Sequence, residues 1–184
     1  MARNTALRSL HDLGLAGWFG GTLANAVALN PAAAHAGGDH DTGAVANAGW
    51  DRWTPVNAAA IGAHLIGSVG LLVGNKGRIG HQQGVASMAL LKTGLTAAAL
   101  GATAYSRALG QKVSEHHDVP AESGTSPTAE TPRHIANAQR QLAALQWVVP
   151  AVTGTLVAVS AYAGEQQRPS EVKKGFMRRL LVHE

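Results

Sequence analysis

The stretch Gln141–Gly164 reads QLAALQWVVPAVTGTLVAVSAYAG, and it contains no Asp, Glu, Lys or Arg. A helix needs about 20 predominantly apolar residues to cross the roughly 30 Å of hydrocarbon in a bilayer. Uncharged stretches of this length are unusual in soluble domains. The stretch therefore predicts a membrane-spanning helix over about residues 142–163, anchored by Trp147 and Tyr162 and bent at Pro150.

Three further apolar stretches precede this one and predict spans over about residues 13–29, 56–74 and 85–105. The first is short and rich in glycine, and it stops at the turn-favouring pair Asn30-Pro31. The third contains one cation, Lys92, whose backbone would lie about 10 Å inside the span. We interpret Lys92 as a side chain that snorkels to the interface, with a buried functional lysine as the alternative.

Composition limits the classes of function that the chain can serve. The 184 residues are 46% hydrophobic and only 14% charged, where about 25% is typical of soluble domains. The absence of cysteine excludes disulfides, thiolate metal sites and cysteine nucleophiles. The cations flank apolar stretches and accompany no nucleic-acid-binding motif, so no nucleic-acid partner is expected. Phosphate-loop, zinc-protease and serine-hydrolase motifs are also absent, which predicts a non-enzymatic protein.

These patterns predict an all-α fold, a four-helix transmembrane bundle in the cell membrane with cytoplasmic N and C termini. The bundle would occupy residues 1–164, with outer loops at 30–55 and 106–140 and a cytoplasmic tail at 165–184. This orientation leaves nine Lys and Arg residues inside and five outside, as the positive-inside rule favours. The alternative is a cleaved signal peptide over residues 1–36, because Ala34-His35-Ala36 fits a cleavage site, and it would leave three spans.

Two polar segments have distinct compositions. The segment 119–133, VPAESGTSPTAETPR, is too poor in apolar residues to order itself and predicts a mobile loop. The tail places apolar residues at helical spacing beside a group of cations, which predicts a basic amphipathic helix on an anionic membrane surface. Its membrane-surface residues are Lys173, Lys174, Arg178 and Arg179.

Small residues recur four apart in the first three spans, as in Gly17 with Gly21, Ala63 with Gly67 and Gly94 with Ala98. In lipid, helices associate by close backbone approach through small residues. The pairs therefore predict tight packing within the bundle, with a self-association face as the alternative.

His64 is the one histidine near the middle of a predicted span. An ionisable group at this depth is a functional hypothesis, because a neutral imidazole can ligate haem or another metal, or relay a proton. The alternative is a structural histidine that hydrogen-bonds across the bundle to Asn25, Thr93 or Thr96. No second histidine lies within a span to complete a two-histidine haem site.

Two predicted outer loops carry histidines beside carboxylates, in HAGGDHD (35–41) and EHHD (115–118). Imidazole and carboxylate groups from loops on one side of a membrane can assemble a Zn or Cu site. Their spacing matches no standard zinc motif. The candidate metal ligands are His35, His40, His116 and His117.

Residues 11–21 contain the pattern H-x6-W-x-G-G, formed by His11, Trp18, Gly20 and Gly21. This pattern resembles the opening helix of the membrane domains of copper-resistance D type proteins and related small four-helix families. The resemblance implies a compact helical bundle with metal association at His11. A helix N-cap at Asp12 explains the same residues without a metal. The Ala- and Gly-rich composition favours a high-GC bacterial source such as an actinobacterium.

The sequence predicts an accessory or scaffold subunit of a cell-envelope membrane complex, whose partners are the lipid bilayer and other membrane subunits or further copies of itself. The alternative is a metal- or haem-associated transport or redox protein that uses His64 with His11 or the outer-loop histidines. A third class, a membrane-embedded enzyme, would use His64 and Lys92 as acid and base.

Overall fold

The computed structural model describes residues 4–35, 37, 39–76, 85–115 and 121–165. It is 88% helical, and the predicted all-α class is confirmed. The helices are α1 (Thr5–Ala24), α2 (Asn30–Ala33), α3 (Asp39–Gly74), α5 (Val85–Ser114) and α6 (Arg133–Glu165), with a π-helical turn, Asn25–Leu29, between α1 and α2. A two-stranded antiparallel hairpin is formed by β1 (Ala121–Ser123) and β2 (Ser126–Pro127).

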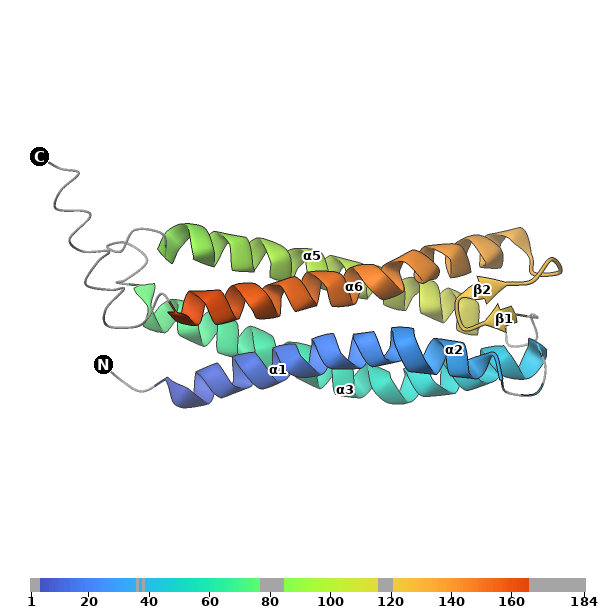
Figure 1. Ribbon diagram of the computed structural model, residues 1–184, viewed down its shortest axis with the longest axis horizontal. Helices are drawn as coiled ribbons and strands as arrows, with labels where there is room; N and C mark the ends of the chain where they lie inside the picture. The colour runs from blue at the N-terminus through green and yellow to red at the C-terminus, as the bar shows by residue number, and fades with distance from the viewer. Residues whose placement is uncertain (1–3, 36, 38, 77–84, 116–120, 166–184) are drawn as a thin grey trace, which may run out of the picture.

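Four long helical rods lie side by side (Figure 1). The rod formed by α1, the π turn and α2 packs mainly on α3, while α5 packs mainly on α6. A further contact between α1 and α6 joins the two pairs, whereas α3 and α5 touch only sparsely. The hairpin lies at the end of the molecule opposite the start of α1. The pairing of the rods leaves a seam between α3 and α5.

The helices extend well beyond the predicted spans. Residues 39–55 and 106–114, which were expected in loops, belong to α3 and α5. The first rod continues through the predicted stop at Asn30-Pro31 to Ala33, and Pro31 lies just after the π-helical turn, where the regular α-helical hydrogen-bond pattern is already interrupted. Thr42 and Ala46 of α3 are buried, so packing stabilises a segment that has no strong helical pattern of its own.

The expectation of a loop without structure over residues 119–133 was wrong for the part that the structure describes. Residues 121–127 form the hairpin, and its turn residue Gly124 contacts Asn30 and Ala46. The segment buries little apolar surface of its own, but it packs on the surface formed by α2 and α3. The composition of the segment does not reveal that surface, because it belongs to other parts of the chain.

Close backbone approach joins α1 to α3, as the small residues predicted. A Cβ at Gly14 would collide with the backbone of Ala60 and His64, and one at Gly67 would collide with the backbone of Leu7 and His11. Gly94 and Gly101 of α5 have no neighbouring atom within 4 Å. The predicted packing role therefore holds for α1 and α3, while Gly94 and Gly101 of α5 face open space among the described residues.

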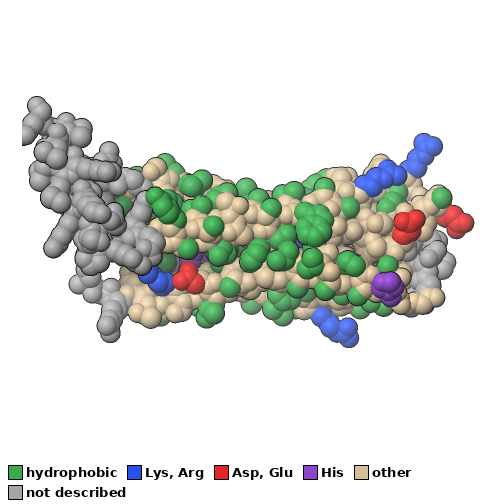
Figure 2. Space-filling view, viewed as in Figure 1, with side chains coloured by type: hydrophobic (Ala, Val, Ile, Leu, Met, Phe, Trp, Pro, Cys, Tyr) green, Lys and Arg blue, Asp and Glu red, His purple; other side chains and the backbone are tan. Residues whose placement is uncertain are grey.

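The surface is apolar and the interior is partly polar. Large hydrophobic side chains are exposed along all four rods, and Figure 2 shows them over most of one face, with charged side chains mainly toward the two ends. Three helices in the described chain are long and apolar enough to cross a membrane: Thr42–Gly74, Val85–Ser114 and Arg133–Gly164. The first predicted span is not among them, since Arg8, His11 and Asp12 lower the apolar content of α1.

Candidate functional site

Two histidines from different helices meet inside the molecule. His11 lies in the first half of α1 and His64 in the second half of α3, and their ring centroids are 4.6 Å apart with planes tilted by 49°. The Trp18 ring centroid lies 6.1 Å from that of His64. All three side chains are buried, His64 and Trp18 completely. The close approach through Gly14 and Gly67 is what brings the two imidazoles together.

The hydrogen-bond partners define the tautomers of both rings. Nδ1 of His64 lies 3.2 Å from the backbone carbonyl oxygen of His11, which can only accept, so this nitrogen carries the proton. Nδ1 of His11 lies 2.7 Å from the Asp12 carboxylate and donates to it. Each neutral ring therefore has a lone pair on Nε2. The Ser68 and Thr96 hydroxyls lie 3.4 and 3.5 Å from Nε2 of His64 and are its only described partners.

A function that uses His64 with His11 was one alternative from the sequence, but the direct packing of the two rings was not predicted. The interpretation of His64 as a cross-bundle hydrogen-bonding residue named Thr96 correctly, but it assumed that no second imidazole was near. His11 precedes the first predicted span by two residues, so it was not counted among the histidines within a span. Gly14 and Gly67, one helical turn from His11 and His64, were the signal in the sequence, because small residues mark where two helices approach.

A cavity of about 390 Å³ opens beside the histidine pair, and we name it the His11 cavity. It lies in the seam between α3 and α5, and its walls are mostly aliphatic. Six polar side chains line it: His11, Ser68, Asn75, Lys92, Thr93 and Thr96. Nε2 of His11 is buried and has no hydrogen-bond partner among the described residues. An imidazole with an unpaired nitrogen and an ammonium group therefore line the same cavity.

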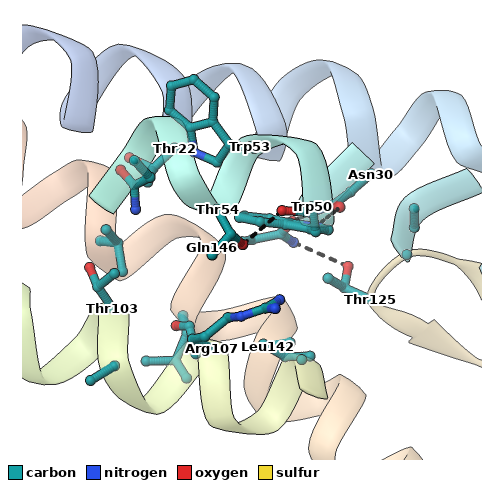
Figure 3. Close-up of a pocket in the computed structure, with 18 of the residues that line it drawn as sticks. Thr22, Asn30, Trp50, Trp53, Thr54, Thr103, Arg107, Thr125, Leu142 and Gln146 are labelled. Carbon is teal, nitrogen blue, oxygen red and sulfur yellow. Dashed lines mark hydrogen bonds between the residues drawn. The ribbon is translucent and has the colours of Figure 1, made fainter. Parts of the chain in front are cut away.

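A second cavity, of about 320 Å³, lies in the same seam near the hairpin and is named the hairpin cavity (Figure 3). A chain of hydrogen bonds forms one wall. The Trp50 indole N–H donates to Oδ1 of Asn30 over 3.0 Å, Nδ2 of Asn30 donates to Gln146 over 2.8 Å, and Gln146 donates to Thr125 over 3.4 Å. These bonds tie α2 and α3 to α6 and the hairpin turn.

The opposite wall of the hairpin cavity comes from α5 and α6. Arg107 of α5 and Leu142 of α6 lie across from Trp50 and Thr54 in Figure 3. The guanidinium of Arg107 makes one exposed contact with Asp51, at 3.5 Å. Two polar atoms of lining residues on α3, Oδ1 of Asn57 and Nε1 of Trp53, are buried without a partner among the described residues. Arg107 is therefore the cation on the wall of this cavity.

Leu100 lines both cavities, so they are two parts of one seam. On α5 the lining residues run from Val85 to Ser114, and they include two cations, Lys92 and Arg107. Fifteen residues of helix separate the two cations, which corresponds to about 22 Å along the axis. Each cavity thus has one cation on its α5 wall.

The predicted loop metal site is not assembled among the described residues. His35 is exposed at the end of α2, while the side chain of His40 and the whole of His116 and His117 lie outside the described part. No group of three or more His, Asp or Glu side chains in the described ranges could hold a metal ion. The predicted tail residues also lie outside these ranges: Lys173, Lys174, Arg178 and Arg179.

No protein-family model matches the chain, and neither a curated protein nor a solved structure matches it.

Proposed function

We propose that the protein is a non-enzymatic accessory or scaffold subunit of a cell-envelope membrane complex. In this proposal the four rods form a multi-pass transmembrane bundle in the cell membrane, with both termini in the cytoplasm and the hairpin outside. The observation that carries the proposal is the exposure of α5. Only 6% of its most apolar 18-residue window is buried within the protein.

An apolar helix with so little cover needs an apolar surrounding, because each exposed aliphatic side chain would cost free energy in water. The buried polar groups support the same environment. Asn30, Asn57, His64 and Thr153 lie inside, while Ile66, Val69 and Leu90 point outward. A polar interior and an apolar exterior suit a bundle in lipid, where polar side chains hydrogen-bond between helices.

One face of α5 is suited to a partner helix. Leu90, Gly94, Ala97 and Gly101 recur at intervals of three and four residues and are exposed. The two glycines have open space where a Cβ would be, so a second backbone can approach closely. A transmembrane helix of another subunit is the occupant that we assign to this face.

Site-specific photocrosslinking in native membranes tests the proposal. A photoreactive residue at Gly101 of α5 is expected to give a discrete adduct with another membrane protein, whereas the same residue at Ile66, which is exposed on α3, is not. Gly101→Leu should weaken recovery of that partner, and Gly20→Leu serves as the matched control, since Gly20 also has open space around it. An adduct with twice the mass of the chain would identify the partner as a second copy of the chain. Adducts with lipid alone would overturn the assignment.

A second candidate is a metal- or haem-associated transport or redox protein. The pairing of His11 with His64 favours it, because metal-ligating histidines commonly donate the other ring N–H to a carboxylate or a backbone carbonyl, as both rings do here. The absorption spectrum of protein purified in mild detergent distinguishes the two. A Soret band that His64→Ala abolishes would favour haem, and a colourless, metal-free sample would exclude this candidate.

A further inference from the structure

Lys92 lines a mostly aliphatic cavity without a direct ion pair. Among the described residues no carboxylate lies within ion-pair distance of it, and no hydrogen bond from its ammonium group is present. The one described carboxylate whose charge acts on it, Asp12, accepts a hydrogen bond from His11 instead. A charge held in low-dielectric surroundings is costly unless an opposite charge is near. Lys92 therefore calls for an anion from outside the chain.

His11 lines the same cavity as Lys92. Its Nδ1–H donates to Asp12, so Nε2 carries a lone pair that needs a donor, and no described residue supplies one. Leaving such a group unpaired in an apolar site costs about 1–3 kcal/mol. An ionised head group accepts from the Lys92 ammonium and has no proton to give, so a water that donates one O–H to Nε2 of His11 and the other to the head group joins the two.

The walls of the His11 cavity indicate the chemistry of the rest of the ligand. Beyond the polar side chains the His11 cavity is lined by aliphatic residues, including Leu65, Leu72 and Met88. The seam continues past Leu100 into the hairpin cavity, over the roughly 22 Å that separates Lys92 from Arg107. Two mostly apolar cavities that share Leu100 have the lining that one hydrocarbon chain needs.

We propose that the seam between α3 and α5 binds a single-chain amphiphile with an acidic head group, a free fatty acid or an anionic lysophospholipid. The head group lies at Lys92 and His11, with Ser68 and Thr96 as further hydrogen-bond partners. The chain follows the seam past Leu100 toward the hairpin. Because the Cα–Cβ bonds of a helix tilt toward its N-terminus, the Lys92 ammonium lies nearer the start of α5, which leaves the remainder of the seam to the chain.

Native mass spectrometry of the delipidated protein, with four probes, tests the proposal. Palmitate and palmitoyl-lysophosphatidylglycerol are expected to bind at one per chain, and methyl palmitate, which lacks the acid, about tenfold or more weakly. Equal binding of methyl palmitate would show that the charge of the head group does not contribute to binding, and would overturn the proposal. Inorganic phosphate that competes as well as palmitate would show an anion site without a chain site, and would also overturn the proposal.

Variants locate the site. Lys92→Gln should weaken palmitate binding about tenfold or more, while Lys92→Arg, which keeps the charge, should retain it. Lys76→Gln is the matched control, because Lys76 is exposed just beyond α3 and lines neither cavity. Unchanged binding in Lys92→Gln, or an equal loss in Lys76→Gln, contradicts the proposal.

Chain length gives a readout that does not depend on the charged residues. Leu100→Trp narrows the seam where the two cavities meet, so it should weaken palmitate more than hexanoate, whose chain ends before Leu100. Equal effects on the two acids would show that the chain does not pass this residue. A loss of partner adducts at Gly101 with palmitate binding intact would affect the proposed function alone, so the two proposals fail separately.

Discussion

Gly14 and Gly67 determine how closely α1 and α3 approach, and through that distance they determine whether His11 and His64 meet. A methyl group at either glycine would overlap backbone atoms of the opposite helix, which cannot move aside as a flexible side chain can. The histidine pair, its tautomers and the position of the His11 cavity all depend on this contact. Two residues without side chains thus position the most polar part of the interior.

Gly14→Ala is expected to destabilise the protein by about 1–3 kcal/mol, because the added methyl group separates α1 from α3. Thermal unfolding in mild detergent measures the effect. Gly20→Ala, where the methyl group meets nothing, should be neutral or slightly stabilising, since alanine favours a helix more than glycine does. An equal loss in both variants would refute a special role for the Gly14 contact.

The bond between Trp18 and Thr103 links the two helix pairs. Nε1 of Trp18 donates to Oγ1 of Thr103 over 3.1 Å, and Trp18 is completely buried. Thr103→Val should lower the free energy of unfolding by about 1–3 kcal/mol, because it leaves the buried indole N–H without a partner. A double-mutant cycle with Trp18→Phe isolates the pair, and a coupling energy near zero would mean that the bond contributes nothing to stability.

At the residue scale, the sequence identified single candidate residues better than it identified the residues that contact them. His64 could be selected because it is the one histidine near the middle of a span, and its contact with Thr96 was anticipated. The proximity of His11 could not be derived, because it depends on the register of two antiparallel helices. The orphaned Nε2 of His11 and the unpaired Lys92 follow from the same register.

Among the elements, the hairpin and the first half of α3 are held by packing and hydrogen bonds that join distant segments. Asn30 is their central residue, since it bonds to both Trp50 and Gln146 and contacts Gly124 of the hairpin turn. Each of these residues lies more than 15 positions from Asn30 in the chain. Local composition therefore predicted loops where the structure has helix and strand.

Asn30→Ala should loosen these elements without unfolding the rest of the protein. The substitution leaves the Trp50 N–H and the Gln146 carbonyl unpaired, at a cost of about 1–3 kcal/mol. Hydrogen exchange should accelerate over residues 42–55 and 121–127 and stay unchanged around His64. The exposed amide Asn137 supplies the control, and exchange that accelerates equally in Asn137→Ala would contradict the role assigned to Asn30.

For the whole molecule, the all-α class and three of the four predicted apolar helices could be read from uncharged stretches of sufficient length. Those stretches are visible along the sequence itself, so identifying them needs no knowledge of how the helices pack. The seam between α3 and α5 could not be predicted, because it arises from which helices pair. The rod that contains α1 fills the space between α3 and α6, and α5 is left in contact with α6 alone along most of its length.

The central claim is that the apolar exterior of this molecule faces lipid, with the hairpin outside the cell and the start of α1 inside. Because the native chain has no cysteine, single cysteines report their own surroundings. Labelling with a membrane-impermeant maleimide is expected to reach Glu122→Cys in intact cells and Lys76→Cys only after permeabilisation. Ile66→Cys, exposed on α3 near the middle of the predicted span 56–74, should react only after denaturation in detergent. Labelling of Ile66→Cys in intact cells at the rate of Glu122→Cys would contradict the account.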